Sequence, residues 1–349
     1  MNANINARCK ATRTEPGGIK VFTISALGES MKILRDLRPG RHVAISYPNQ
    51  SGAIQERLYS IMAQPEETAF EIAVKSTGRG GVADNMHATL NEGASISLLH
   101  VAGEITIDTV LGFECLGMIA GGIGVTLPLA LLRELDRKAR HGMRVPQSTL
   151  IVCFPRVADI PFLQELLQLS LTAPWFKLQI HLTRENAGTT GCFVSGRPTA
   201  ASLHVMGQPQ SVVICGSHAF VRTFREHVRI RFPSASQQIE SFTPPTLSMP
   251  QDESSLLPAC RIEITQREQV LEMESGKSLL EILESKGISI RSQCRAGICG
   301  VCRIRITGGS SRFEADFCLS DSERENGYAL ACCTFPISGN IQIDLRSTV

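Results

Sequence analysis

The sequence predicts a multidomain protein that combines an antiparallel β-barrel, an α/β domain with a parallel sheet and a small α+β domain. Its 349 residues exceed the roughly 150 residues that are typical of one domain. Short apolar runs with frequent turns give way to strands that alternate with helical patterns, and a stretch rich in proline and serine precedes the last part. The apolar share of 43% with 19% charged residues excludes a disordered chain.

The first part has the texture of an antiparallel barrel or sandwich. Turn signals such as Pro39-Gly40 and Pro48-Asn49 separate its apolar runs about once every ten residues. The runs are KVFTIS, HVAISY, FEIAVK and SISLLHV. This spacing is typical of all-β domains, and we expect a barrel domain over residues 1–108.

The second part, residues 109–242, alternates apolar strands with helical patterns. CLGMIA, TLIVCF and SVVICG are followed by LPLALLRELDRKA, IPFLQELLQLSL and AFVRTFREHV. Such alternation predicts βαβ units and a parallel sheet. Residues 115–132 are uncharged and apolar enough to suggest a membrane span, but GGIG, Thr126 and Pro128 favour a strand, a turn and the start of a helix.

The third part follows a linker over residues 243–259, whose proline, serine and charged residues show no periodicity. Residues 260–349 are expected to contain the strands RIEIT, VCRIRIT and IQIDL and the helix SLLEILESKG. Ser278 is the expected N-cap of this helix, and Gly287 is expected to end it.

Six of the twelve cysteines lie after residue 260. Four of them follow the C-x4-C-x2-C…C spacing that holds a 2Fe-2S cluster. They are Cys294, Cys299, Cys302 and Cys332. Gly297 and Gly300 would let the backbone approach the cluster closely. A zinc site is the alternative, because two of these cysteines form a CxxC pair, but the four-residue spacing with its RAG loop is foreign to zinc knuckles.

This tail resembles a plant-type ferredoxin in CRAGICGVC and LACCTFP. The resemblance implies a β-grasp fold and makes Cys332, rather than its neighbour Cys333, the fourth ligand. Cys318 would be the ligand if a shorter loop closed the site. Residues 1–18 lack the apolar core of a signal peptide, so we expect reduced thiols in the cytoplasm.

Two glycine turns are expected to meet at one edge of the parallel sheet. MIAGGIGVT and SVVICG each end a strand before a helix, where a pyrophosphate can approach the helix N-terminus. Either turn alone could be an ordinary tight turn without a ligand. The residues predicted to bind the nucleotide are Gly121, Gly122, Gly124, Thr126, Cys215 and Gly216.

In the first domain, ERLYS and the glycines of GRGGVADNMH resemble the flavin-binding segments of the ferredoxin-NADP reductase superfamily. An aromatic ring can pack on an isoalloxazine, and a guanidinium can bind a phosphate with two hydrogen bonds. The resemblance implies flavin contacts from these segments and from the end of FEIAVK. The residues are Arg57, Leu58, Tyr59, Ser60, Ala73, Val74, Lys75, Gly80, Gly81 and Val82.

The order of barrel, nucleotide domain, linker and ferredoxin resembles the phthalate dioxygenase reductase family over nearly the whole chain. This resemblance implies FMN, NADH and a 2Fe-2S cluster as cofactors, with FAD as the alternative flavin. Thr126 and Cys215 would lie where the nicotinamide meets the flavin, as the catalytic pair, and Phe242 would lie near the flavin. The sequence departs from the family pattern at Ala83, Leu127 and Ser217; the first change removes one possible phosphate hydroxyl.

The function that this resemblance implies is an NADH-dependent reductase of a multicomponent mono- or dioxygenase. Electrons would pass from NADH through the flavin and the cluster to a separate oxygenase, which the resemblance implies is of the Rieske type. A reductase for another acceptor and a redox-sensing subunit are the alternatives. Arg156 would favour NADPH and Asp159 would favour NADH. The net charge of +2 and the aromatic share of 5% argue against a nucleic-acid partner, and we expect a monomer without membrane attachment.

Overall fold

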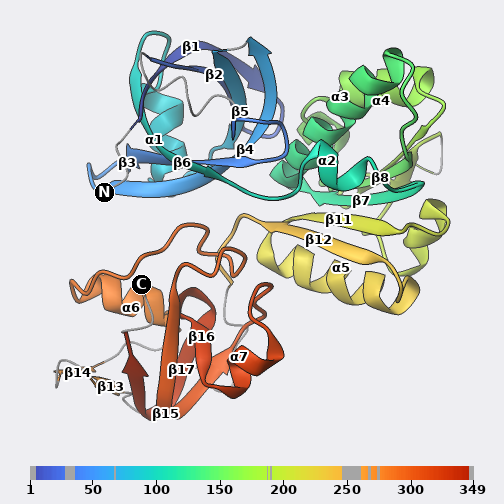
Figure 1. Ribbon diagram of the computed structural model, residues 1–349. Helices are drawn as coiled ribbons and strands as arrows, with labels where there is room; N and C mark the ends of the chain where they lie inside the picture. Colours follow the sequence, from blue (N-terminus) through green and yellow to red (C-terminus); the bar gives the residue numbers. More distant parts are fainter. Residues whose placement is uncertain are drawn as a thin grey trace. The chain divides into compact units, whose positions relative to one another are not determined.

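The computed structural model describes residues 5–27, 36–66, 68–186, 188, 191–245, 261–265, 269–272 and 276–345. The chain separates into two compact units. The first contains Met1–Gly216 and Thr223–Glu240, and the second contains Ser217–Arg222 and Ser241–Val349. Figure 1 shows the elements of each unit. The predicted linker falls mostly on residues 246–260, which lie outside the described residues.

The first unit begins with a closed six-stranded barrel in the order β1-β2-β5-β4-β3-β6, with antiparallel neighbours throughout (Figure 1). Its elements are β1 (Ile5–Glu15), β2 (Ile19–Ala26), β3 (His42–Pro48), β4 (Ile54–Glu66), β5 (Ala69–Lys75), α1 (Val82–Thr89), β6 (Ser95–Ala102) and α2 (Ile107–Val110). Phe22, Ile45 and Ile72 are fully buried in its core. The predicted barrel is confirmed.

The strand β1 was not expected from the sequence, although it closes the barrel by pairing with both β2 and β6. Its segment INARCKATRTE is mostly polar, and only Ala7 and Cys9 are buried. A strand with so few core-facing side chains carries little apolar alternation, so only its pairing partners reveal it.

The rest of the first unit is a six-stranded sheet in the order β10-β9-β8-β7-β11-β12. Its elements are β7 (Cys115–Gly121), η2 (Gly122–Val125), α3 (Thr126–Arg140), β8 (Gln147–Phe154), η3 (Val157–Asp159), α4 (Leu163–Thr172), β9 (Phe176–Leu182), β10 (Phe193–Ser195), η4 (Ala201–Met206), β11 (Ser211–Gly216), α5 (His218–Arg231) from Thr223 onward and β12 (Ser236–Ser241) up to Glu240. The first five strands of that order pair in parallel, which confirms the predicted sheet. The run predicted for α5, residues 219–228, lies inside the observed helix, and β12 was not among the predicted strands.

The apolar stretch 115–132 forms β7, the turn η2 and the start of α3, as predicted. Glycine at position 122 adopts φ +56°, a conformation that side-chain-bearing residues rarely adopt. No helix within the described residues is both long and apolar enough to cross a membrane.

The second unit is built on a five-stranded sheet in the order β14-β13-β17-β15-β16. Its elements are β13 (Arg261–Ile264), β14 (Gln269–Glu272), α6 (Leu279–Ser285), β15 (Arg303–Phe313), α7 (Asp321–Glu325), β16 (Tyr328–Leu330), η5 (Ala331–Cys333) and β17 (Thr334–Asp344). The helix α6 starts at a capping box in which Ser278 Oγ accepts from Glu281 N and Glu281 Oε2 accepts from Ser278 N. The helix packs its leucines into the core beside Ile304, which confirms the predicted α+β domain.

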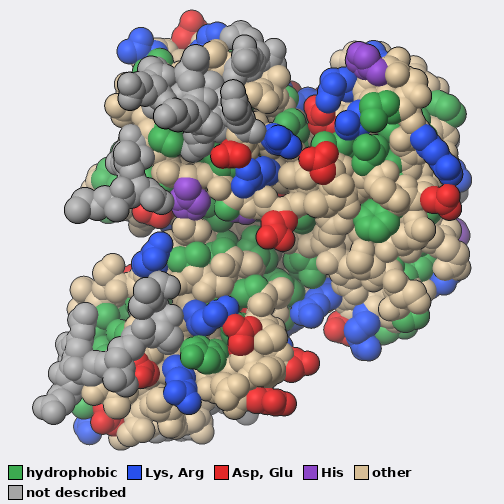
Figure 2. All heavy atoms as spheres, in the orientation of Figure 1, with side chains coloured by type: hydrophobic (Ala, Val, Ile, Leu, Met, Phe, Trp, Pro, Cys, Tyr) green, Lys and Arg blue, Asp and Glu red, His purple; other side chains and the backbone are tan. Residues whose placement is uncertain are grey.

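The surface carries both signs of charge. On the face drawn in Figure 2, Lys and Arg side chains are interspersed with Asp and Glu. This distribution fits the near balance of 35 basic and 33 acidic residues.

Candidate functional site

The cysteine-rich loop lies between α6 and β15, and its backbone conformation depends on special positions. Gly297 and Gly300 have φ values of +76° and +70°. Arg295 also adopts a positive φ of +53°, and its guanidinium is held 2.5 Å from Glu284 on α6. The loop backbone therefore curls around the Cys294 thiol, and Ala296 N donates to Cys294 Sγ at 3.4 Å.

The four predicted cluster cysteines come together as two pairs. The thiols of Cys294 and Cys299 are hydrogen-bonded, and so are those of Cys302 and Cys332. Within the described part of the chain, no three His, Cys, Asp or Glu side chains gather around one point as for a single metal ion. Two pairs of thiols are what a cluster of two irons with two protein ligands on each requires, so these side chains fit a 2Fe-2S group.

Two further cysteines lie beside these pairs. Cys333 Sγ is 3.6 Å from Cys332 Sγ, and both side chains are buried. A Cβ added to Gly297 would lie 2.7 Å from Cys333 Sγ, so Cys333 faces the back of the loop. Burial raises the pKa of the Cys318 thiol to about 12, and the negative charge of Asp316 adds to the rise. The partner of Cys302 in this arrangement is Cys332.

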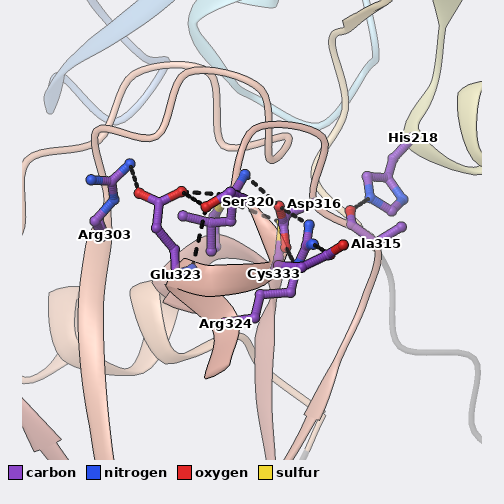
Figure 3. Close-up of polar contacts among 11 residues, drawn as sticks. His218, Arg303, Ala315, Asp316, Ser320, Glu323, Arg324 and Cys333 are labelled. Carbon is purple, nitrogen blue, oxygen red and sulfur yellow. Dashed lines mark hydrogen bonds and ion pairs between the residues drawn. The ribbon is translucent and has the colours of Figure 1, made fainter. Parts of the chain in front are cut away.

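The segment that connects β15 to β16 is fixed by ion pairs (Figure 3). Arg324 Nη2 lies 2.9 Å from Asp316 Oδ1, and Arg303 Nη2 lies 2.8 Å from Glu323 Oε1. Ser320 caps the short helix α7 by exchanging hydrogen bonds with Glu323. These contacts hold residues 314–325 in place.

The same segment supports the back of the cysteine loop. Phe317 N donates to Gly297 O at 2.9 Å, and His218 Nε2 donates to Ala315 O at 2.6 Å (Figure 3). Burial lowers the pKa of His218, so its ring is favoured in the neutral form that can donate from Nε2. No periodic signal in the sequence points to His218, and only the fold reveals this contact.

In the first unit, the two glycine turns meet as expected at the end of the parallel strands. Cys215 on β11 pairs with Ala120 on β7. A Cβ added to Gly124 would lie only 2.4 Å from the carbonyl oxygen of Cys215. The turn η2, which contains Gly122 and Gly124 and follows Gly121, also contacts β5 of the barrel. The fold therefore requires glycine at position 124.

Cys215 and the start of α3 form one buried group. The Leu127 N–H donates to Cys215 Sγ, and Thr126 Oγ1 donates to Ile123 O at 3.0 Å. Cys215 is fully buried, and burial together with the nearby Glu240 raises the pKa of its thiol. The thiol is therefore protonated at neutral pH, and the Thr126 hydroxyl fixes the turn.

Glu240 on β12 is a site residue that the sequence did not single out. Its carboxylate accepts a hydrogen bond from Ser60 Oγ on β4 and lies near the Cys215 thiol. Burial raises the pKa of Glu240 to about 7, and the hydrogen bond from Ser60 opposes the rise. A buried acid brings together Ser60 and Cys215, two residues that the sequence placed in separate motifs.

We expect Glu240→Gln to remove a pH dependence of stability. Because the folded-state pKa of Glu240 is raised to about 7 from 4.5, the native state retains a proton that the unfolded state loses, and stability falls as pH rises through this window. The loss is on the order of 3 kcal/mol. Urea unfolding followed by the fluorescence of Trp175, the single tryptophan, measures it at pH 5 and pH 8.

In that experiment the variant should gain stability over the parent chain at pH 8 and little at pH 5. Glu114→Gln is the matched control, because Glu114 is exposed in the same unit. Parallel pH profiles for the parent chain and Glu240→Gln would contradict the prediction.

The predicted flavin residues of β4 point to alternate sides of the strand. Tyr59 packs against the barrel core, and burial raises the pKa of its phenol. Arg57 Nη1 donates to Glu56 O and Nη2 to Gln55 Oε1, each at 2.7 Å. Leu58 lies on the same side as Ser60. Tyr59 and Ser60 therefore offer a ring on one side and a hydroxyl on the other.

The end of β5 and the following loop contain the other predicted flavin residues. Val74 is buried in the barrel core, Ala73 is buried and Lys75 is exposed. Gly80 and Gly81 precede Val82, the first residue of α1. The backbone of this loop donates hydrogen bonds to Asp84, a buried acid that the sequence reasoning did not single out.

The remaining predicted residues lie in different environments. Phe242 follows β12, is half-buried and falls in the second unit. Arg156 is exposed, whereas Asp159 ends the turn η3 and is half-buried. Their roles toward the flavin and the nucleotide stay predictions.

Comparison with known proteins links this geometry to a family. Residues 262–336 match the family described as a 2Fe-2S iron-sulfur cluster binding domain. The chain is 24% identical to the glycine betaine monooxygenase reductase subunit of Chromohalobacter salexigens, over 97% of this chain and 94% of that protein. It is 23% identical to the phthalate dioxygenase reductase of Burkholderia cepacia, over 88% and 87% of the two chains.

The fold points the same way. A solved structure of phthalate dioxygenase reductase aligns with a TM-score of 0.64 and 22% identity, covering 98% of both chains. The match therefore includes the barrel, the parallel sheet and the cysteine-bearing domain in the same order. Residues 262–336 therefore carry a 2Fe-2S iron-sulfur cluster binding domain, and the whole chain is similar in sequence to reductases of oxygenase systems and in fold to phthalate dioxygenase reductase.

Proposed function

We propose that this chain is the reductase component of an oxygenase system and passes electrons from NADH, through a flavin and a 2Fe-2S cluster, to a separate oxygenase. The observation that carries the proposal is the pairing of four cysteines in a domain that shares one chain with a barrel and a parallel sheet. Two relatives support it, because their names make them the reductases of glycine betaine monooxygenase and phthalate dioxygenase.

Each part of the chain has a separate task in this proposal. The bound flavin is proposed to be FMN, with FAD as the alternative. It would accept two electrons together from the nicotinamide and pass them one at a time to the cluster. Tyr59 packs on its ring, and Arg57 provides a positive charge for its phosphate. The remainder of the flavin site is proposed to be lined by residues of the barrel: Leu58, Ser60, Ala73, Val74, Lys75, Gly80, Gly81 and Val82. A role of Phe242 toward the flavin is a proposal that rests on the family resemblance alone.

The nicotinamide is proposed to enter where the two glycine turns meet. Gly121, Gly122, Gly124 and Gly216 leave room for the nucleotide at the helix starts. The buried, protonated Cys215 thiol forms an uncharged wall there, and Thr126 holds the turn through its bond to Ile123 O. NADH is proposed over NADPH, with Asp159 on the ribose.

The finer features of the partner are also proposals. We infer a Rieske-type oxygenase as acceptor, a monomeric reductase in the cytoplasm, and binding to neither nucleic acid nor membrane. The mixed charges on the face in Figure 2 and the net charge of +2 support the proposal that the chain does not bind nucleic acid. The family likeness supports the rest.

Anaerobic titration of the purified chain with NADH tests the main proposal. The flavin absorbance should bleach first and the iron-sulfur bands should follow, because the cluster receives its electrons through the flavin. NADPH in a parallel titration measures the nucleotide preference. Absence of bleaching with either nucleotide would refute the reductase, and bleaching without rapid cytochrome c reduction would favour a redox-sensing subunit.

A further inference from the structure

The loop between β5 and α1 holds a carboxylate at its centre. Asp84 Oδ1 accepts from Ser76 Oγ, Thr77 N and Gly78 N at 2.7, 2.6 and 2.9 Å. Asp84 Oδ2 accepts from Thr77 Oγ1, Arg79 N and Gly81 N at 3.0, 2.8 and 3.2 Å. Six donors from residues 76–81 therefore converge on one side chain that is only 5% exposed.

Helix capping explains only part of this arrangement. Asp84 is the third residue of α1, and its bond to Gly81 N closes the helix start as a capping box does. The donors from Ser76, Thr77, Gly78 and Arg79 lie before the cap and are not needed to start a helix. The carboxylate thus organises the whole loop.

Converging backbone N–H groups of this kind normally form a site for an external anion such as a phosphate. Here the chain supplies its own anion. Burial acts to raise the pKa of Asp84, but the hydrogen bonds from Ser76, Gly78 and Thr77 outweigh it and hold the pKa well below its usual range. The side chain is therefore negatively charged at neutral pH, and a phosphate in the loop would lose these donors and face a like charge.

We propose that Asp84 is a specificity-determining residue of the flavin site: its carboxylate fills the loop of residues 76–81, so the flavin phosphate lies outside the loop and adds little to binding. The inference rests on the proposed function, because it assumes that the barrel binds a flavin. Gly80, Gly81 and Val82 then line the flavin, but their loop donates no hydrogen bond to the flavin phosphate. Arg57 supplies the positive charge for that phosphate.

The first test compares FMN with riboflavin, which lacks the phosphate. The full-length chain, freed of its flavin, is titrated with each compound while flavin fluorescence is followed. The two dissociation constants should lie within about tenfold of each other, the equivalent of one ordinary polar contact. FMN binding about a hundredfold tighter than riboflavin would overturn the proposal, since several charge-assisted bonds would then be reaching the phosphate.

The second test uses variants that remove the charge. Asp84→Asn keeps the shape of the side chain, and Asp84→Ser keeps one acceptor while opening the loop. Either should strengthen FMN binding relative to riboflavin by about tenfold, because a nearby like charge is removed. Glu92→Gln is the matched control, since it removes one exposed negative charge from the turn after α1 and should leave the ratio unchanged.

Riboflavin affinity also reports whether the variants keep an intact barrel. An equal change for FMN and riboflavin in both Asp84 variants would overturn the proposal, because Asp84 would then act on folding alone. Failure of the unaltered chain to bind riboflavin or FMN would refute the proposed flavin site itself and this inference with it. The test depends on the ratio of the two dissociation constants, not on the rate of NADH oxidation.

Discussion

Replacing Cys332 with alanine is expected to abolish the iron-sulfur absorbance of the purified chain. In the structure, Cys332 pairs with Cys302 and completes the second of two thiol pairs. A two-iron cluster needs four protein ligands. Loss of a residue that only hydrogen-bonds a metal ligand typically lowers activity about 10- to 100-fold. Because Cys332→Ala removes a ligand itself, the rate of NADH-driven cytochrome c reduction should fall by more than that. Flavin bleaching by NADH should persist.

The matched control is Cys333→Ala, which removes the adjacent buried thiol. Cys333 Sγ faces Gly297 at the back of the loop, so this variant should keep the cluster absorbance and iron content. The opposite pattern, with the cluster lost in Cys333→Ala and kept in Cys332→Ala, would show that Cys333 is the fourth ligand and would contradict the prediction. Iron analysis and visible spectra distinguish the two results.

Gly124→Ala is expected to have the second largest effect, because it separates the two glycine turns. The added Cβ would lie 2.4 Å from the oxygen and 2.7 Å from the carbon of the Cys215 carbonyl. Both atoms belong to the backbone, so no side-chain rotation relieves the clash. Overpacking of this kind costs about 1–3 kcal/mol. Urea unfolding followed by Trp175 fluorescence measures the loss, and flavin reduction by NADH should slow in parallel.

Gly112→Ala is the control for this substitution. Its added Cβ meets no atom within 4 Å, so the same chemical change should leave stability close to that of the parent chain. The iron-sulfur spectrum should be unaltered in both variants, since the four predicted cluster cysteines lie in the second unit. A Gly124→Ala chain with parental stability and flavin reduction would show that the turns can separate without cost.

The sequence alone predicted those parts of the fold that have strong local signals. The parallel strands β7, β8 and β11 are largely apolar runs, and α6 has both its cap residue and its terminating glycine. The barrel strands β1 and β4, the edge strand β12 and the short strands β10, β14 and β16 were missed. Each has few core-facing side chains or is too short to show a period, so pairing with neighbours determines it.

The candidate site divides in the same way. The cysteine spacing by itself predicted the metal chemistry, because three of the four predicted ligands lie on one loop and their separation is a local property. The glycine turns also followed from local pattern, because strands that run in parallel end at a common edge. The tertiary structure alone decided that Glu240 meets Ser60 and Cys215, which lie far apart in sequence.

Asp84 gives the clearest case of a decision that belongs to the tertiary structure. From the sequence, GRGG before a helix predicts a loop whose amides are available to a phosphate. The folded loop turns those amides onto a carboxylate three residues beyond its last glycine. Which glycines and cysteines are present follows from sequence, but which anion a set of amides binds depends on distances that only the folded backbone establishes.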